Sequence, residues 1–98
     1  MTPEQHYLFE AQLWRDPGAT WFFITVPDPV SAQIRFMAGG VKGFGTVRVD
    51  VRLGESRWKT SLFPDKASGC YFLPVKADIR RAERISHGDR VSVELRIS

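Results

Sequence analysis

Val47-Arg48-Val49-Asp50-Val51-Arg52-Leu53 is the stretch that decides the fold, because it returns near the end of the chain as Val91-Ser92-Val93-Glu94-Leu95-Arg96-Ile97. Apolar and polar residues alternate in both copies, which is the period-two pattern of a strand with one buried face. Alternation alone proves little, since many strands alternate. The two copies also share an ending of acid, apolar residue and arginine, which is Asp50-Val51-Arg52 in the first and Glu94-Leu95-Arg96 in the second. This shared ending favours a genuine repeat.

Residues before the two strands repeat as well. Each strand is preceded by an apolar residue with a proline, and then by an Ile-Arg pair. The offsets between the copies are 47 residues for the prolines, 45 for the Ile-Arg pairs and 44 for the strands. The sequence therefore predicts two similar halves, roughly residues 20–53 and 68–98, that close one β-rich core. The landmarks are Val26-Pro27 and Ile34-Arg35 in the first copy, and Leu73-Pro74 and Ile79-Arg80 in the second.

Other elements follow from local patterns. A strand at 21–26 is rich in aromatic and β-branched residues, so we expect it to be largely buried, with Trp21 in the core. A short helix is predicted from Asp28, which can cap it, to Gly39-Gly40, with Pro29 in the first position. A second short helix is predicted at 77–84. The remaining strands are predicted at 7–14, 57–63 and 70–73.

These elements predict one all-β domain over residues 1–98. We expect a small closed β-barrel of about six strands with two short helices and a pseudo-twofold internal repeat. Closure is expected on physical grounds, because a strongly alternating sheet of this size would otherwise leave unpaired edges open to aggregation. The hydrophobic content of 43% supports a core that needs neither a disulfide nor a metal.

Composition excludes several kinds of site. The single cysteine, Cys70, excludes an internal disulfide and a cysteine-rich zinc site, and His6 and His87 do not form a metal-binding spacing. No metal and no cofactor are predicted. No apolar run approaches the ~20 residues that span a bilayer, and the N-terminus lacks the regions of a signal peptide. A cytoplasmic protein is therefore expected.

No catalytic residue is predicted. Cys70 would need His6 or His87 as a base, and a free cysteine is more often a small buried hydrophobic residue. Asp50 and Glu94 occupy equivalent places in the two copies, where paired carboxylates could transfer protons. Arginines stand beside both of them, so cross-strand ion pairs are the simpler interpretation. The chain is expected not to be an enzyme.

Charge is distributed unevenly along the chain. Residues 1–41 carry two positive and four negative charges, and residues 42–98 carry twelve and seven, so the net charges are −2 and +5. This balance suits a nucleic-acid or other anionic partner, although interspersed acids and bases are also typical of a solvated sheet face. The candidate contacts are the basic residues of the second helix with one matched arginine of the first: Lys76, Arg80, Arg81, Arg84 and Arg35.

Four other residues are candidate partner contacts. Trp58 and Lys59 place an aromatic ring beside a basic group, a combination that can stack bases or hold ligands. Trp58 shares its predicted strand face with apolar residues, so a place in the core is the competing interpretation. Lys42 and Phe44 lie in the glycine-rich connection 39–45, which lacks the phosphate-loop pattern.

Motifs along most of the chain, from Phe9 to Leu95, resemble a family of small bacterial domains of unknown function, DUF1905. Order and spacing both match. The resemblance implies a double-split β-barrel. The matching segments are Val26-Pro27, residues 48–53, Ser61-Leu62-Phe63-Pro64, residues 73–76, Ile79-Arg80 and Gly88-Asp89-Arg90-Val91.

The second half also resembles swapped-hairpin modules of the AbrB/MazE type, through Leu73-Pro74, Ile79-Arg80 and Gly88-Asp89-Arg90-Val91. Those modules build one barrel from two chains, and many bind DNA. The resemblance implies that one chain with two such halves could fold as a monomer, and it leaves a dimer open.

The sequence therefore predicts a small non-enzymatic binding or interaction module of the cytoplasm. Its partner could be a protein, a small ligand or a nucleic acid, and no membrane partner is expected. The first alternative is a DNA-binding regulator of the swapped-hairpin type. The second is a small-ligand-binding protein or an enzyme with a pocket in the barrel mouth.

Overall fold

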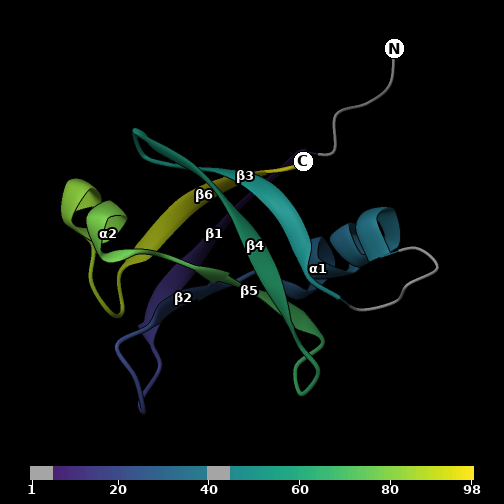
Figure 1. Ribbon diagram of the computed structural model, residues 1–98, viewed down its shortest axis with the longest axis horizontal. Coiled ribbons are helices and arrows are strands. Elements are labelled where there is room, and N and C mark those ends of the chain that lie inside the picture. Colours follow the sequence, from purple (N-terminus) through teal and green to yellow (C-terminus); the bar gives the residue numbers. More distant parts are fainter. Residues whose placement is uncertain (1–5, 40–44) are drawn as a thin grey trace.

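Six strands form a closed barrel in the structure, a computed structural model that describes residues 6–39 and 45–98 (Figure 1). They pair antiparallel in the order β1-β2-β5-β4-β3-β6, and β6 pairs with β1 to complete the circle. The predicted all-β barrel with two short helices is confirmed. The strands are β1 (His6–Arg15), β2 (Phe22–Thr25), β3 (Val47–Leu53), β4 (Ser56–Asp65), β5 (Cys70–Pro74) and β6 (Arg90–Ile97).

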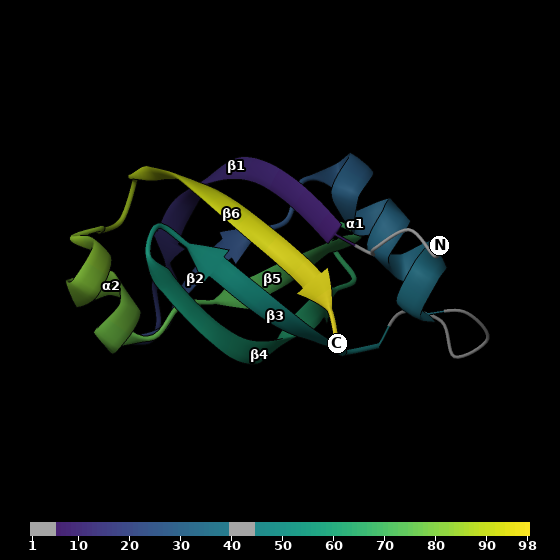
Figure 2. The same cartoon turned by 90° about the horizontal axis from the view of Figure 1, so that it is seen from above.

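The two α-helices of the described residues lie at opposite ends of the barrel (Figure 2). α1 (Asp28–Ile34) follows β2 and continues as a π-helical turn, η1 (Arg35–Gly39), whereas α2 (Ala77–Glu83) follows β5. Ile34 is fully buried and Ile79 packs against the core. Each helix thus covers one end of the barrel. Within the described ranges, no helix is both long and apolar enough to cross a membrane.

The strand pairing has the two-fold relation that the repeat predicts. The order around the barrel is unchanged when β1, β2 and β3 are exchanged with β4, β5 and β6. Val51 of β3 lies opposite Leu95 of β6, which is its own counterpart in the repeat. The relation extends to β1 and β4, because Tyr7 lies opposite Leu95 just as Trp58 lies opposite Val51. The repeat was not recognised in β1 and β4 from the sequence, because these two strands share no motif.

The interior is apolar because alternate residues of each strand point inward. In β3, buried valine and leucine residues alternate with exposed or half-buried charged ones, and β6 follows the same scheme. Tyr71 of β5 is the largest of the fully buried side chains and joins Leu13, Ile24 and Leu95 in one core cluster. All six strands supply this core, so the residues that differ between strands are the outward ones.

The start of α1 differs from the prediction. Pro27 is the N-cap and makes no side-chain capping bond, so Asp28 does not cap the helix. Ser31 holds the start of α1 instead. Its buried hydroxyl donates to the carbonyl of Val26 at 2.9 Å and accepts from the amide of Tyr71 at 3.1 Å. These bonds fix α1 against β5.

Trp21 is not in the core, and that prediction is wrong. Its side chain is 58% exposed. Ile24 of β2 points inward, and alternation therefore turns Phe22 inward while Trp21 and Phe23 face out. Three consecutive aromatic residues cannot all lie on one face of a strand.

Candidate binding surfaces

Five aromatic side chains gather on the outside of the barrel, where β1, β2, β5 and β4 adjoin. The register sets Trp14 opposite Phe23, and Phe63 opposite Phe72. Their sequence neighbours Leu13, Ile24, Leu62, Tyr71 and Leu73 point inward and are buried. We call this surface the aromatic face: Trp14, Trp21, Phe23, Phe63 and Phe72.

Ring contacts make the middle of the aromatic face rigid. The centroid of Trp14 lies 5.1 Å from that of Phe23 and 5.0 Å from that of Phe72, which it meets edge-on. The indole Nε1 of Trp14 donates to Thr25 Oγ1 at 2.9 Å. Phe23 and Phe72 are themselves 5.8 Å apart. Such tilted and edge-to-face contacts are the favoured arrangements of aromatic rings.

The ends of the aromatic face are open to solvent. Trp21 stacks on Phe23 with centroids 6.1 Å apart and an interplanar angle of 9°, while its other ring face stays exposed. Phe63 is 45% exposed. Lys76 borders Trp21, because the amide of Val75 donates to the carbonyl of Phe22 and the register continues one residue further.

A second surface lies on the outside of β3, β4 and β6. Asp50 lies opposite Arg96 on one side and Lys59 on the other, and Arg52 lies between Glu94 and Arg57. Ion pairs join Asp50 to Lys59 at 3.5 Å and Glu94 to Arg52 at 3.9 Å. The expected cross-strand ion pairs are therefore present. We call this surface the charged face: Asp50, Arg52, Arg57, Lys59, Glu94 and Arg96.

Glu94 is the most strongly engaged acid of the charged face. Its carboxylate lies 2.6 Å from His6 Nε2. That hydrogen bond is the largest cause of a pKa of Glu94 below its ordinary value of 4.5. Desolvation opposes it, and the charges of His6, Arg52 and Arg57 each add a lesser lowering effect. His6 and the neighbouring arginines thus favour the ionised form of Glu94.

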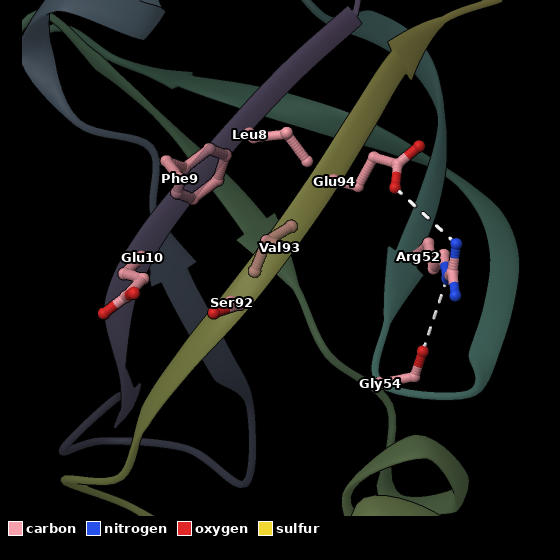
Figure 3. Close-up of a pocket in the computed structure, with 8 residues that line it drawn as sticks. All are labelled: Leu8, Phe9, Glu10, Arg52, Gly54, Ser92, Val93 and Glu94. Carbon is pink, nitrogen blue, oxygen red and sulfur yellow. Dashed lines mark hydrogen bonds and ion pairs between the residues drawn. The ribbon is translucent and has the colours of Figure 1, made fainter.

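Two open hollows mark the outer surface of these strands. One of about 500 Å³ lies over β1, β6 and the end of β3, where Figure 3 shows Leu8, Glu94 and Arg52 reaching out from neighbouring strands. Arg52 there spans from Glu94 to the carbonyl of Gly54. The other, of about 630 Å³, lies over the charged face and also touches Val51 and Trp58.

Four of the five predicted basic contacts lie on α2 and its two caps, whereas Arg35 lies at the other end of the barrel. Arg80 is held in place, since its Nε donates to the carbonyl of Val75 at 3.3 Å and its guanidinium lies 3.7 Å from the centroid of Phe22. Arg81 pairs with Asp78. Lys76 and Arg84 are exposed. Arg35 belongs to η1, at the opposite end of the barrel from α2, so it does not form a pair with Arg80 (Figure 2).

The predicted partner contacts have different positions. Lys59 is exposed on the charged face. Trp58 faces inward and packs half-buried against the core, and its indole Nε1 is buried without a hydrogen-bond partner in the described residues. Trp58 is therefore a core residue at the rim of the larger hollow. Lys42 and Phe44 lie outside the described residues.

Most of the barrel, the whole aromatic face and all of the charged face except Arg96 fall inside a region that matches a known family model. The model named "Domain of unknown function (DUF1905)" matches residues 9–95. The chain belongs to the DUF1905 family. The expected resemblance is thus confirmed over β1 to β6, whereas no curated protein matches this DUF1905 domain.

Cys70 of the DUF1905 domain lies in a polar pocket beside α1. Its thiol donates to Asp28 Oδ1 at 3.2 Å, and the side chain is buried. Burial raises the pKa of the Cys70 thiol, and the hydrogen bond and negative charge of Asp28 raise it further. A thiol that stays protonated is a weak nucleophile. In the described ranges, no three His, Cys, Asp or Glu side chains are grouped as metal ligands.

Sequence reasoning missed most of the aromatic face. The signal was present in the run Trp21-Phe22-Phe23, which a strand must divide between its two faces. Phe72 likewise alternates with the buried Tyr71 and Leu73. What the sequence lacked was the pairing order, which sets β1, β2, β5 and β4 side by side.

Proposed function

We propose that this DUF1905 domain is a non-enzymatic module that binds a protein partner on its aromatic face. The observation that carries the proposal is the exposure of Trp21 and Phe63 at the two ends of a packed aromatic cluster. The barrel core is complete without these two side chains. Contiguous exposed apolar surface on a soluble domain is typical of an interaction site, and Trp is enriched where binding energy concentrates.

A protein partner suits the aromatic face better than a nucleic acid does. Base stacking needs a series of exposed ring faces beside a basic groove. Here Trp14 meets Phe72 edge-on and Phe23 at a tilt, so these rings pack against one another and are not free to stack on bases. Lys76 borders Trp21, and of the arginines that follow it, Arg80 lies against Phe22 and Arg81 is paired with Asp78.

The DNA-binding alternative has less support. Two of the four basic residues predicted to contact DNA near α2 are engaged within the domain. Arg80 contacts Val75 and Phe22, and Arg81 pairs with Asp78. The swapped-hairpin resemblance and the cytoplasmic location stay predictions. A regulator of that type would lose affinity steeply as salt rises, because each neutralised phosphate releases counterions.

A selection of linear peptides tests the proposal. Wild-type domain is panned against a library of random peptides, and the affinity of enriched peptides is measured by the fluorescence anisotropy of labelled peptides. A double variant, Trp21→Ala with Phe63→Ala, is expected to weaken binding at least tenfold, since an anchor residue is worth ~2 kcal/mol or more.

Leu8→Ala is the matched control. Leu8 is 70% exposed, but it lies on the outer surface of β1 beside Glu94, away from the aromatic face. Its removal should leave peptide affinity unchanged. The proposal is wrong if no peptide is enriched, or if peptides bind the double variant as tightly as wild type. If single-stranded oligonucleotides bind and their binding depends on Trp21 and Phe63, the partner of the aromatic face is a nucleic acid and not a protein.

A further inference from the structure

The larger hollow on the charged face carries an inference independent of the protein-binding proposal. Its volume is about 630 Å³, and six of the eight residues around it are charged. Four of these are cations and two are acids, so the lining has a net charge of +2. The lining residues are Asp50, Val51, Arg52, Arg57, Trp58, Lys59, Glu94 and Arg96.

The two acids of the hollow already have cationic partners. Asp50 pairs with Lys59 at 3.5 Å, and Glu94 pairs with His6 at 2.6 Å and with Arg52 at 3.9 Å. The depressed pKa of Glu94 agrees with a positive surrounding. Each acid thus has a cation nearby, although Asp50 Oδ1 makes no hydrogen bond within the described residues. The excess positive charge belongs to other residues.

That excess resides on Arg57 and Arg96. Among residues 6–39 and 45–98, neither guanidinium makes a hydrogen bond or a close ion pair, and both side chains are exposed. The charge of Arg57 acts on Glu94 only as a lesser contribution to its lowered pKa. Arg57 lies in the row of Arg52 and Glu94, and Arg96 lies in the next row, opposite Asp50. With strands ~4.8 Å apart and same-face residues ~7 Å apart, their Cα atoms are about 12 Å apart. Two arginine side chains can converge across that distance.

We propose that this hollow binds a phosphate monoester, with Arg57 and Arg96 as its clamp. A guanidinium matches phosphate oxygens through two parallel N–H donors, and a dianion balances the net charge of the lining. A nucleic acid strand fits less well. The phosphates of a strand longer than the hollow would lie close to the carboxylates of Asp50 and Glu94, and then to that of Glu10, which pairs with Arg90. Phosphates and carboxylates repel each other.

The test is an NMR titration of the arginine Nε–H signals with phenyl phosphate and, in a separate arm, inorganic phosphate. Ionic strength is held constant with sodium chloride. The signals of Arg57 and Arg96 are expected to shift and saturate with both probes. Arg57→Gln and Arg96→Gln should each weaken binding about tenfold, because each removes a charge-assisted pair. Both side chains are exposed, so the variants should fold as wild type does.

Arg48→Gln is the matched control. Arg48 is exposed on the same outward side of β3, but it donates to Ser61 Oγ at 3.3 Å and lies outside the hollow. The control should bind phenyl phosphate as wild type does. An equal loss in Arg48→Gln would overturn the proposal, as would the same shifts with chloride alone. Oligonucleotide binding at Arg57 and Arg96 without phenyl phosphate binding would overturn it in favour of a polyanion.

Discussion

The strand pairs β2–β5 and β3–β6, each of which joins a strand to its own counterpart in the repeat, form two antiparallel seams with opposite chemistry on their outer sides. Outside the seam of β2 and β5, the surface consists of aromatic rings that contact one another. Outside the seam of β3 and β6, it consists of alternating acids and arginines. Inside both seams, the residues are apolar and buried. Inward positions are constrained by one shared core, so the outward positions carry what distinguishes the two seams.

This difference also separates two kinds of stabilisation. Aromatic contacts outside β2 and β5 bury apolar area and act at short range, so a single truncation leaves a gap. Exposed ion pairs outside β3 and β6 are screened by water and contribute ~0–1 kcal/mol each. Substitutions on the two sides should therefore differ in size, and the following predictions sharpen that contrast.

Trp14→Ala should have the largest effect. Trp14 contacts the rings of Phe23 and Phe72 and donates to Thr25. Removal of this half-buried ring should lower the free energy of unfolding by about 2–4 kcal/mol, measured by urea denaturation. Trp21→Ala is the comparison, because it removes an exposed ring of the same face, and it should cost less than ~1 kcal/mol. Equal losses would contradict a rigid centre with open ends.

Gly54→Ala should have an intermediate effect on the charged side. Gly54 adopts φ +62° in the turn from β3 to β4, a conformation that costs alanine ~1 kcal/mol. An added Cβ would also collide with the carboxylate of Glu83, which accepts from Ser56 Oγ at 2.6 Å and fastens α2 to β4. We expect a loss of about 2 kcal/mol in urea denaturation and faster amide exchange in α2.

Gly18→Ala is the control for that prediction. An added Cβ at Gly18 meets nothing within 4 Å, and its φ is not in the left-handed region. Its stability should change by less than ~0.5 kcal/mol. A loss in Gly54→Ala no larger than that of Gly18→Ala would show that the contact with Glu83 is dispensable.

Glu94→Gln should have the smallest effect, and the effect should depend on pH. The pKa of Glu94 is lower in the folded protein than its ordinary value of 4.5. Its ionised form therefore stabilises the fold above pH 4.5, and this contribution is lost as pH falls through the lowered pKa. Urea midpoints of wild type and variant should differ at pH 7 and converge in acid. A difference that stays constant with pH would rule out the carboxylate charge as its source.

The repeat in the sequence predicted two similar halves, and closure into a barrel was expected from the cost of open sheet edges and from the family resemblance. Alternation identified the inward residues of β3 and β6, and the matched prolines and Ile-Arg pairs placed a helix in each half. These features are local and periodic, so a single sequence displays them. The role of Asp28 could not be predicted, because its partner Cys70 lies 42 residues away and is reached only through the fold.

The candidate surfaces were harder to predict for a related reason. Lys59 was recognised from the sequence, but Arg57 and Arg96 become neighbours only when β3 lies between β4 and β6. The basic residues near α2 looked like a cluster in the sequence. In the fold Arg80 turns back onto Phe22 and Val75. Proximity along the chain thus revealed the basic group at α2 and hid the pair formed by Arg57 and Arg96.

The place of β6 in the circle has a consequence for synthesis. β6 lies between β1 and β3, and it is the last of the six strands to leave the ribosome. Until then, the facing edges of β1 and β3 have no partner, and an exposed edge can recruit another chain. Pairing across such a long span of sequence is also slow. The nascent domain is therefore most vulnerable to misassembly just before its final strand emerges.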